Sequence, residues 1–198
     1  SESFLIGSSA DNMSAIIEKS PSKSDIVYPA GDRIVCTNHF QGEAFANYKN
    51  NIENISRSDS KYRFDRVNEL LDADSLIDVG DAVSILRNRM GKGNEELGMG
   101  NPLAINQLIA HHSVVFKPSE HLVWISTPPF QLGKFVCYDL DSVFSLKADD
   151  IKSNSEICTG KLTIQADPFL QSESYANFSR YLGMTEELKK YIRDQKEM

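Results

Sequence analysis

Residues 113–138, SVVFKPSEHLVWISTPPFQLGKFVCY, hold three runs of β-branched and aromatic residues separated by turn-forming residues. The three runs are Ser113–Phe116, Leu122–Ser126 and Lys134–Tyr138. The connections between them are short, whereas a parallel crossover needs about a dozen residues or more. The stretch therefore predicts an antiparallel meander, which makes antiparallel sheet the first element of the expected fold.

The N-terminal part of the chain predicts further strands. Phe4–Ser9 and Met13–Glu18 are apolar runs on either side of the turn residues Ala10–Asn12, which is typical of a hairpin. Pro21–Asp25 is expected to be a loop. Arg33–Asn38 is rich in β-branched residues and predicts a strand that ends in polar side chains.

Helical spacing begins in the next part of the chain. The polar stretch Gly42–Ser60 is expected to be a surface excursion, and the apolar residues of Tyr62–Leu71 then recur at helical intervals. Asp81–Arg89 fits a second, short helix. The glycine-rich residues Gly91–Gly100 predict a loop. Asn106–His112 is compatible with helix or strand, and we favour a strand leading into Ser113.

Two helices are expected near the C-terminus. Asp167-Pro168 places proline at a first helical position, Gly183 is a helix-ending residue, and Thr185–Glu187 resembles a new helix start. The sequence as a whole predicts an α+β fold of antiparallel β-sheets with flanking helices. Its length of 198 residues is that of one domain, 1–198.

Composition excludes several classes of function. The 21 basic and 28 acidic residues give a net charge of −7, which argues against a nucleic-acid partner. No apolar run approaches the ~18 residues that span a bilayer, so no membrane partner is expected. The three cysteines form no C-x-x-C pair. Localisation is left undecided.

The motifs for cofactors and metals are weak. The loop Gly91–Gly100 lacks both G-x-G-x-x-G and G-x-x-x-x-G-K-[ST], and Glu95-Glu96 would repel a phosphate. His111, His112 and His121 suggest a metal site, but His111 and His112 would point to opposite faces of a strand, so these two cannot share an ion. No G-x-S-x-G elbow is present. We therefore expect no cofactor and no metal.

Two segments carry stronger candidates. Thr37-Asn38-His39-Phe40 places polar side chains where a strand is expected to end, and an asparagine amide there can donate to an oxyanion. A turn-capping role for Asn38 is the alternative. Arg63 and Arg66 share one face at the start of the predicted helix, where the helix dipole disfavours cations. Either they form surface salt bridges or they serve another purpose, such as fixing a carboxylate.

These segments together resemble the N-terminal-nucleophile amidases that include the penicillin acyltransferases (peptidase family C45) and the choloylglycine hydrolases. The matching pieces are the hairpin Phe4–Glu18, the Thr37–Phe40 element, the helix start Asp59–Arg66 and the meander Ser113–Tyr138. The resemblance implies an αββα sandwich and cleavage of a linear amide C–N bond. It also implies an autoproteolytically exposed N-terminal cysteine as nucleophile. Asn38 matches the family's oxyanion-hole asparagine, and Arg63 matches its active-site arginine.

The position of the nucleophile departs from the family pattern. In the family it precedes the Thr-Asn element by well over a hundred residues, whereas Cys36 here lies inside the expected strand. We therefore expect this chain to be the C-terminal portion of the fold, with the cysteine on an upstream segment of the precursor. Alone, the chain is expected to be inactive. A terminal Ser1 nucleophile is a remote alternative.

The expected partners follow from this interpretation. They are a small-molecule N-acyl amide substrate and the missing N-terminal segment of the precursor. Self-association of the chain alone is also expected, because Phe4–Ile6 and Val114–Phe116 would then be left on exposed edges. A non-catalytic binding or scaffold relative of the same fold is the competing hypothesis, and a cysteine upstream distinguishes the two.

Overall fold

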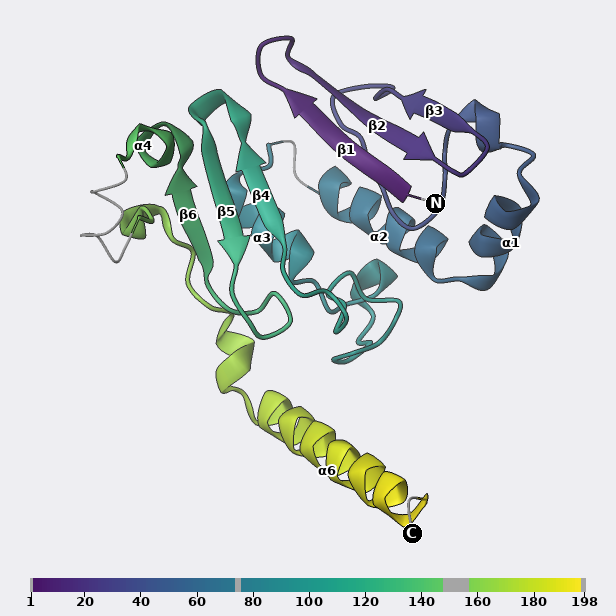
Figure 1. Cartoon of the computed structure of the whole chain (residues 1–198), viewed down its shortest axis with the longest axis vertical. Helices are drawn as coiled ribbons and strands as arrows, with labels where there is room; N and C mark the ends of the chain where they lie inside the picture. Colours follow the sequence, from purple (N-terminus) through teal and green to yellow (C-terminus); the bar gives the residue numbers. More distant parts are fainter. Residues whose placement is uncertain (1, 74–75, 148–156, 197–198) are drawn as a thin grey trace.

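Two antiparallel three-stranded sheets lie side by side, with helices behind them, in the computed structural model of the chain (Figure 1). The structure describes residues 2–73, 76–147 and 157–196. The expected α+β class with antiparallel sheets and flanking helices is confirmed. A layer of sheet with helices on one side is consistent with part of an αββα sandwich.

The first sheet has the strand order β1 (Glu2–Ser8), β2 (Met13–Lys19) and β3 (Ser24–Val27). Its hairpin is as predicted, and the turn places Asn12 at φ 49°, in the left-handed region that asparagine tolerates. The prediction of a loop over Pro21–Asp25 is wrong at its end. The backbone of β3 pairs with β2 there, which the local sequence does not reveal.

One prediction for the segment after the first sheet is wrong. Arg33–Asn38 forms no strand, because no described strand pairs with it. Gly42–Ser60, expected to be a surface excursion, contains η1 (Glu43–Phe45) and α1 (Lys49–Arg57). Burial of the Phe45 ring organises this region, and the ring stacks on Phe40 with 4.1 Å between centroids.

The predicted helices behind the sheets are confirmed. The first is α2 (Ser60–Asp72), with Asp59 as its N-cap residue. The second, α3 (Val79–Leu86), begins two residues before the expected Asp81, because Asp78 and Asp81 form a reciprocal capping box. Its two hydrogen bonds, side chain to backbone in each direction, are both 2.9 Å long. The short η2 (Lys92–Asn94) lies in the glycine-rich loop.

The second sheet is the predicted meander. Its strands are β4 (Val114–Lys117), β5 (Leu122–Ser126) and β6 (Phe135–Asp139), with η3 (Pro118–Glu120) in the first turn. Its inner face packs on α3, where Val83, Trp124, Phe135 and Cys137 form a buried cluster. The strand expected over Asn106–His112 is wrong, because these residues form turns and irregular backbone.

The C-terminal part contains α4 (Leu140–Ser145), η4 (Gly160–Leu162), η5 (Pro168–Gln171) and α6 (Glu173–Lys196). Asp167 caps η5 as expected and accepts from Phe169 N at 2.8 Å. The predicted break at Gly183 is wrong, because α6 is continuous. A glycine costs a helix about 1 kcal/mol relative to alanine, which is not enough to end it.

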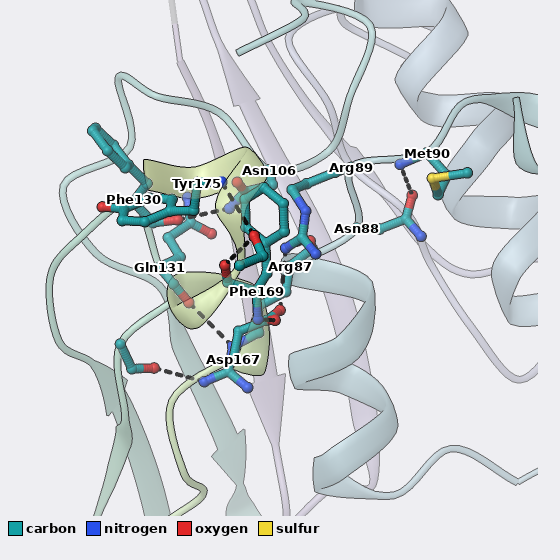
Figure 2. Close-up of polar contacts among 12 residues, drawn as sticks. Arg87, Asn88, Arg89, Met90, Asn106, Phe130, Gln131, Asp167, Phe169 and Tyr175 are labelled. Carbon is teal, nitrogen blue, oxygen red and sulfur yellow. Dashed lines mark hydrogen bonds and ion pairs between the residues drawn. The ribbon is translucent and has the colours of Figure 1, made fainter. Parts of the chain in front are cut away.

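Two arginines after α3 attach the segment leading to α6 to the second sheet (Figure 2). Arg87 donates to the carbonyls of Gln131 and Gly133, at 3.3 and 2.6 Å, and also to that of Gln165 at 2.9 Å. Arg89 donates to Asp167 Oδ2 at 3.1 Å. These contacts hold Gln165 and Asp167, which precede η5 and α6, against the body of the chain.

No helix within the described ranges is long and apolar enough to cross a membrane.

Candidate functional site

Asn38 and Arg63 come together although 25 positions separate them. Asn38 lies in the bend before Phe40, and Arg63 lies in the first turn of α2. Arg63 Nη2 donates to Asn38 Oδ1 at 2.7 Å, and Arg63 Nη1 donates to the carbonyl of Pro102 at 2.6 Å. The structure thus brings together the two residues that the family resemblance singles out. Their catalytic roles remain predictions.

The contact with Arg63 fixes which way the Asn38 amide faces. A guanidinium can only donate, so the amide oxygen must be the atom that faces it. The Nδ2 group then points away from Arg63, and within the described residues it has no acceptor. An amide whose oxygen is bonded to a cation is also a stronger donor through its nitrogen. Asn38 therefore presents an oriented and available N–H donor.

The charge on Arg63 is retained at this position. Burial lowers the pKa of its guanidinium, and the nearby Asp59 carboxylate opposes that shift. Arginine starts from so high a pKa that it stays protonated in proteins. Its two hydrogen bonds, to Asn38 Oδ1 and to Pro102 O, fix the orientation of the guanidinium group, so the positive charge lies at a defined place beside Asn38.

Two asparagines of α1 hold the backbone around Asn38. The buried Asn51 accepts from Phe40 N at 2.8 Å and donates to Phe40 O at 2.9 Å. Asn54, one helical turn later, donates through Nδ2 to Asn38 O at 2.5 Å. Residues three apart share one helix face, so a single short helix fixes both ends of residues 38–40.

A buried carboxylate holds the residues that follow. Glu18 on β2 is fully buried, and its two oxygens accept from Gln41 N at 2.7 Å and Gly42 N at 2.9 Å. Both of these donors are backbone groups, which a loop must satisfy when it is buried. Glu18 therefore anchors the loop to the first sheet.

His39 is part of the framework. Its Nδ1 lies 2.8 Å from Ser60 Oγ and 3.1 Å from Thr37 Oγ1, and its ring packs edge-on against Phe64 at 5.5 Å. Burial lowers the pKa of His39, and the Lys61 charge lowers it further, so the neutral ring is favoured. The network joins the Asn38 segment to the start of α2.

A cavity of about 520 Å³ opens beside Asn38. One wall is Glu2 and Ser3 of β1, another is Cys36–Phe40, and the third is the start of α1 with Tyr48, Asn50, Asn51 and Asn54. Cys36 is the thiol of this cavity. Burial raises its pKa, so it remains a neutral thiol. The cavity therefore has an oriented amide donor but no activated nucleophile among the described residues.

The other candidate motifs form local contacts. The Gly91–Gly100 loop is held by α2, where Tyr62 Oη accepts from Lys92 N at 2.9 Å and Glu69 accepts from Gly93 N at 2.8 Å. His121 lies 2.9 Å from Asp141, which raises the pKa of the histidine. Across the described ranges, no cluster of three or more histidine, cysteine or acidic residues could hold a metal ion.

The sequence does not indicate the α1 asparagines as site residues, because Gly42–Ser60 has the composition of polar surface. Helical spacing of Asn51 and Asn54 was the available signal. It is weak, because asparagine is not a strong helix former and the stretch lacks a broad apolar stripe. The two asparagines act by binding the backbone of residues 38–40, so helical spacing alone does not indicate their role.

A family model described as acyl-coenzyme A:6-aminopenicillanic acid acyl-transferase matches residues 1–93, which include Asn38 and Arg63. The resemblance to the penicillin acyltransferases is thus confirmed over these residues. The match indicates an acyltransferase-type family with small-molecule acyl substrates. No curated protein and no solved structure matches the chain significantly.

Proposed function

We propose, from the family match over residues 1–93, that this chain supplies the oxyanion-stabilising part of the active site of an amide hydrolase or acyltransferase. The observation that carries the proposal is the hydrogen bond from Arg63 Nη2 to Asn38 Oδ1. It holds the Asn38 amide with its N–H side unpaired at the edge of a cavity.

The chemistry that fits this geometry is acyl transfer through a tetrahedral intermediate. Attack on an amide carbonyl places negative charge on its oxygen, and an oriented amide N–H stabilises that charge without reorganisation. Asn38 Nδ2 is the donor in this proposal, and Arg63 positions and polarises it. Removing one such donor costs about 10²–10³ in kcat in enzymes of this kind.

The nucleophile in this proposal is an N-terminal cysteine on a segment outside this sequence. The α-amino group of such a residue is its own base, whereas the three cysteines of the chain are internal and lack a free α-amino group. Cys137 is also buried, and burial raises the pKa of its thiol. The nucleophile would have to enter the cavity beside Asn38.

The edge of β1 is a suitable docking place for that segment. β1 is an edge strand, so one side of its backbone is unpaired, and Glu2 and Ser3 at its start line the cavity. Its apolar side chains are exposed, with Phe4 at 49%, Leu5 at 61% and Ile6 at 48%. A strand added there would restore backbone hydrogen bonds and end next to Asn38.

The test is Asn38→Asp in the protein that carries the cysteine segment. The carboxylate keeps the shape and can still accept from Arg63, but it offers no donor to the oxyanion. We expect kcat toward an N-acyl amide to fall by about 10²–10³. The matched control is Asn50→Asp on the α1 wall of the same cavity, which should leave kcat within about threefold. An unchanged kcat in Asn38→Asp, or ligand binding without turnover in the wild-type protein, contradicts the proposal.

A further inference from the structure

The helix α6 projects away from the rest of the chain (Figure 1). Its first two turns contact the body through aromatic rings. Tyr175 packs edge-on against Phe169 at 5.8 Å, and Phe178 packs against Phe130 at 6.1 Å. Beyond these turns, through residue 195, the side chains are exposed or only half-buried.

An apolar stripe runs along this projecting part. Tyr181, Met184, Leu188 and Tyr191 follow one another at spacings of three, four and three, which keeps them on one face. Their exposed fractions are 63%, 64%, 59% and 62%. A stripe of this spacing is typical of the seam of a two-helix coiled coil, and none of the described residues covers it.

A helix of this composition has little stability of its own. Isolated helices are marginal in water, and Gly183 in the middle of α6 weakens it by about 1 kcal/mol relative to alanine. Most helical stability in proteins comes from packing an apolar face. The stripe therefore needs a partner surface of matching length.

We propose that this partner is α6 of a second copy of the chain, packed antiparallel. When the midpoints of the two stripes coincide, Tyr181 of one copy lies at the level of Tyr191 of the other. Met184 lies at the level of Leu188. Each apolar residue then has an apolar counterpart, and the four residues from each copy fill a continuous seam.

The charges beside the stripe select the antiparallel direction. Arg180 and Asp194 flank the seam on the same side, and each is seven residues from Glu187. In the antiparallel pair, Arg180 of each copy faces Asp194 of the other, which gives two ion pairs related by symmetry. In a parallel pair Arg180 would face Thr185 and Glu187 would face Ile192, so no opposite charges meet. Glu187 of each copy faces Glu187 of the other at the midpoint of the antiparallel pair, which is the one unfavourable contact.

The shape of the chain permits this pairing. The 24 residues of α6 make a helix about 36 Å long, and the body of the chain is attached at its N-terminal end (Figure 1). Antiparallel pairing puts the two bodies at opposite ends of the rod. They therefore do not compete for the same space.

The experiment is analytical ultracentrifugation of the full 198-residue chain and four charge variants. The wild type should show a monomer–dimer equilibrium. Arg180→Asp and Asp194→Arg should each weaken dimerisation at least about tenfold, because two attractions become two repulsions. The double variant, Arg180→Asp with Asp194→Arg, restores opposite charges and should return the dissociation constant to within about threefold of wild type.

Arg193→Asp is the matched control. It makes the same charge change on the outer face of α6 and should leave dimerisation within about twofold. Circular dichroism confirms that each variant retains its fold. A wild-type chain that stays monomeric overturns the proposal. Single variants that dimerise like wild type also overturn it and assign association to the edges of β1 and β4. A double variant that dimerises no more tightly than the single variants also overturns the proposal.

Discussion

Arg63 determines the direction in which the amide of Asn38 donates. Its Nη2 lies 2.7 Å from Asn38 Oδ1, and a cationic donor at that oxygen leaves the amide nitrogen facing the opposite way. Its other terminal nitrogen is held by the carbonyl of Pro102, so the guanidinium cannot turn to another position without losing that bond. The pair behaves as one unit, in which Arg63 orients and Asn38 donates.

Replacing Arg63 should therefore lower kcat more than it raises KM. In the protein that carries the cysteine segment, Arg63→Lys keeps the charge but cannot reach Asn38 Oδ1 and Pro102 O together. We expect a loss in kcat of about tenfold for Arg63→Lys and of about a hundredfold or more for Arg63→Met. Steady-state kinetics measure both values. A wild-type kcat in Arg63→Lys beside a large loss in Arg63→Met would contradict a positioning role, because charge alone would then decide.

Replacing Asn51 should destabilise the chain strongly. Asn51→Leu removes two hydrogen bonds and leaves both the N–H and the C=O of Phe40 without their partners, at a cost of about 2–3 kcal/mol in the free energy of unfolding. Asn50→Leu, at the exposed neighbouring position, should change it by less than about 0.5 kcal/mol. Urea titration followed by circular dichroism compares the two. Similar losses in both variants would mean that Asn51 does not hold the segment.

Acid should destabilise the chain partly through His39. Burial and Lys61 lower the pKa of His39 in the folded state, so below about pH 6.5 the unfolded chain binds a proton more readily than the folded chain. The stabilisation is present above that pH and is lost as the pH falls, with a slope of at most about 1.4 kcal/mol per unit.

The measurement is urea unfolding at pH 7, 6 and 5 for wild type and His39→Gln. The carboxylates titrate in both proteins, so their shared contribution cancels in the difference. The variant should show a shallower loss of stability between pH 7 and pH 5. Parallel curves for the two proteins would show that His39 keeps its ordinary pKa in the fold.

The chain of residues 1–198 alone should not turn over simple N-acyl amides. Its thiols are internal, and the one beside Asn38 has a raised pKa, so no thiolate with a neighbouring α-amino group is available. A chromogenic N-acyl amide assay measures this, and an acylating probe followed by mass spectrometry locates any reactive residue. Turnover that disappears when Ser1 is replaced would contradict the proposed division of the active site.

The local sequence was enough to predict those elements whose residue pattern agrees with the structure that the rest of the fold imposes. The meander Ser113–Tyr138 has strong β-branched runs and turn residues, and Tyr62–Leu71 has regular helical spacing, so both were predicted correctly. The resemblance that assigned Asn38 and Arg63 to one site also came from the sequence. The 2.7 Å contact between them agrees with that assignment.

Elements whose stability comes from a partner could not be predicted in the same way. Arg33–Asn38 has the composition of a strand, yet no described strand pairs with it, and side chains of α1 and α2 hold its end. The four-residue strand β3 forms because the backbone of β2 provides its hydrogen-bond partners.

The sequence by itself determined which residues of this protein can do chemistry, because residue type sets charge, donor capacity and acidity. The tertiary structure alone decided how those residues face one another. Asn38 gains its orientation from Arg63, and its backbone gains its position from Asn54, 16 residues along the chain. Hydrogen bonds between distant segments form only once the chain has packed, so no local pattern encodes them.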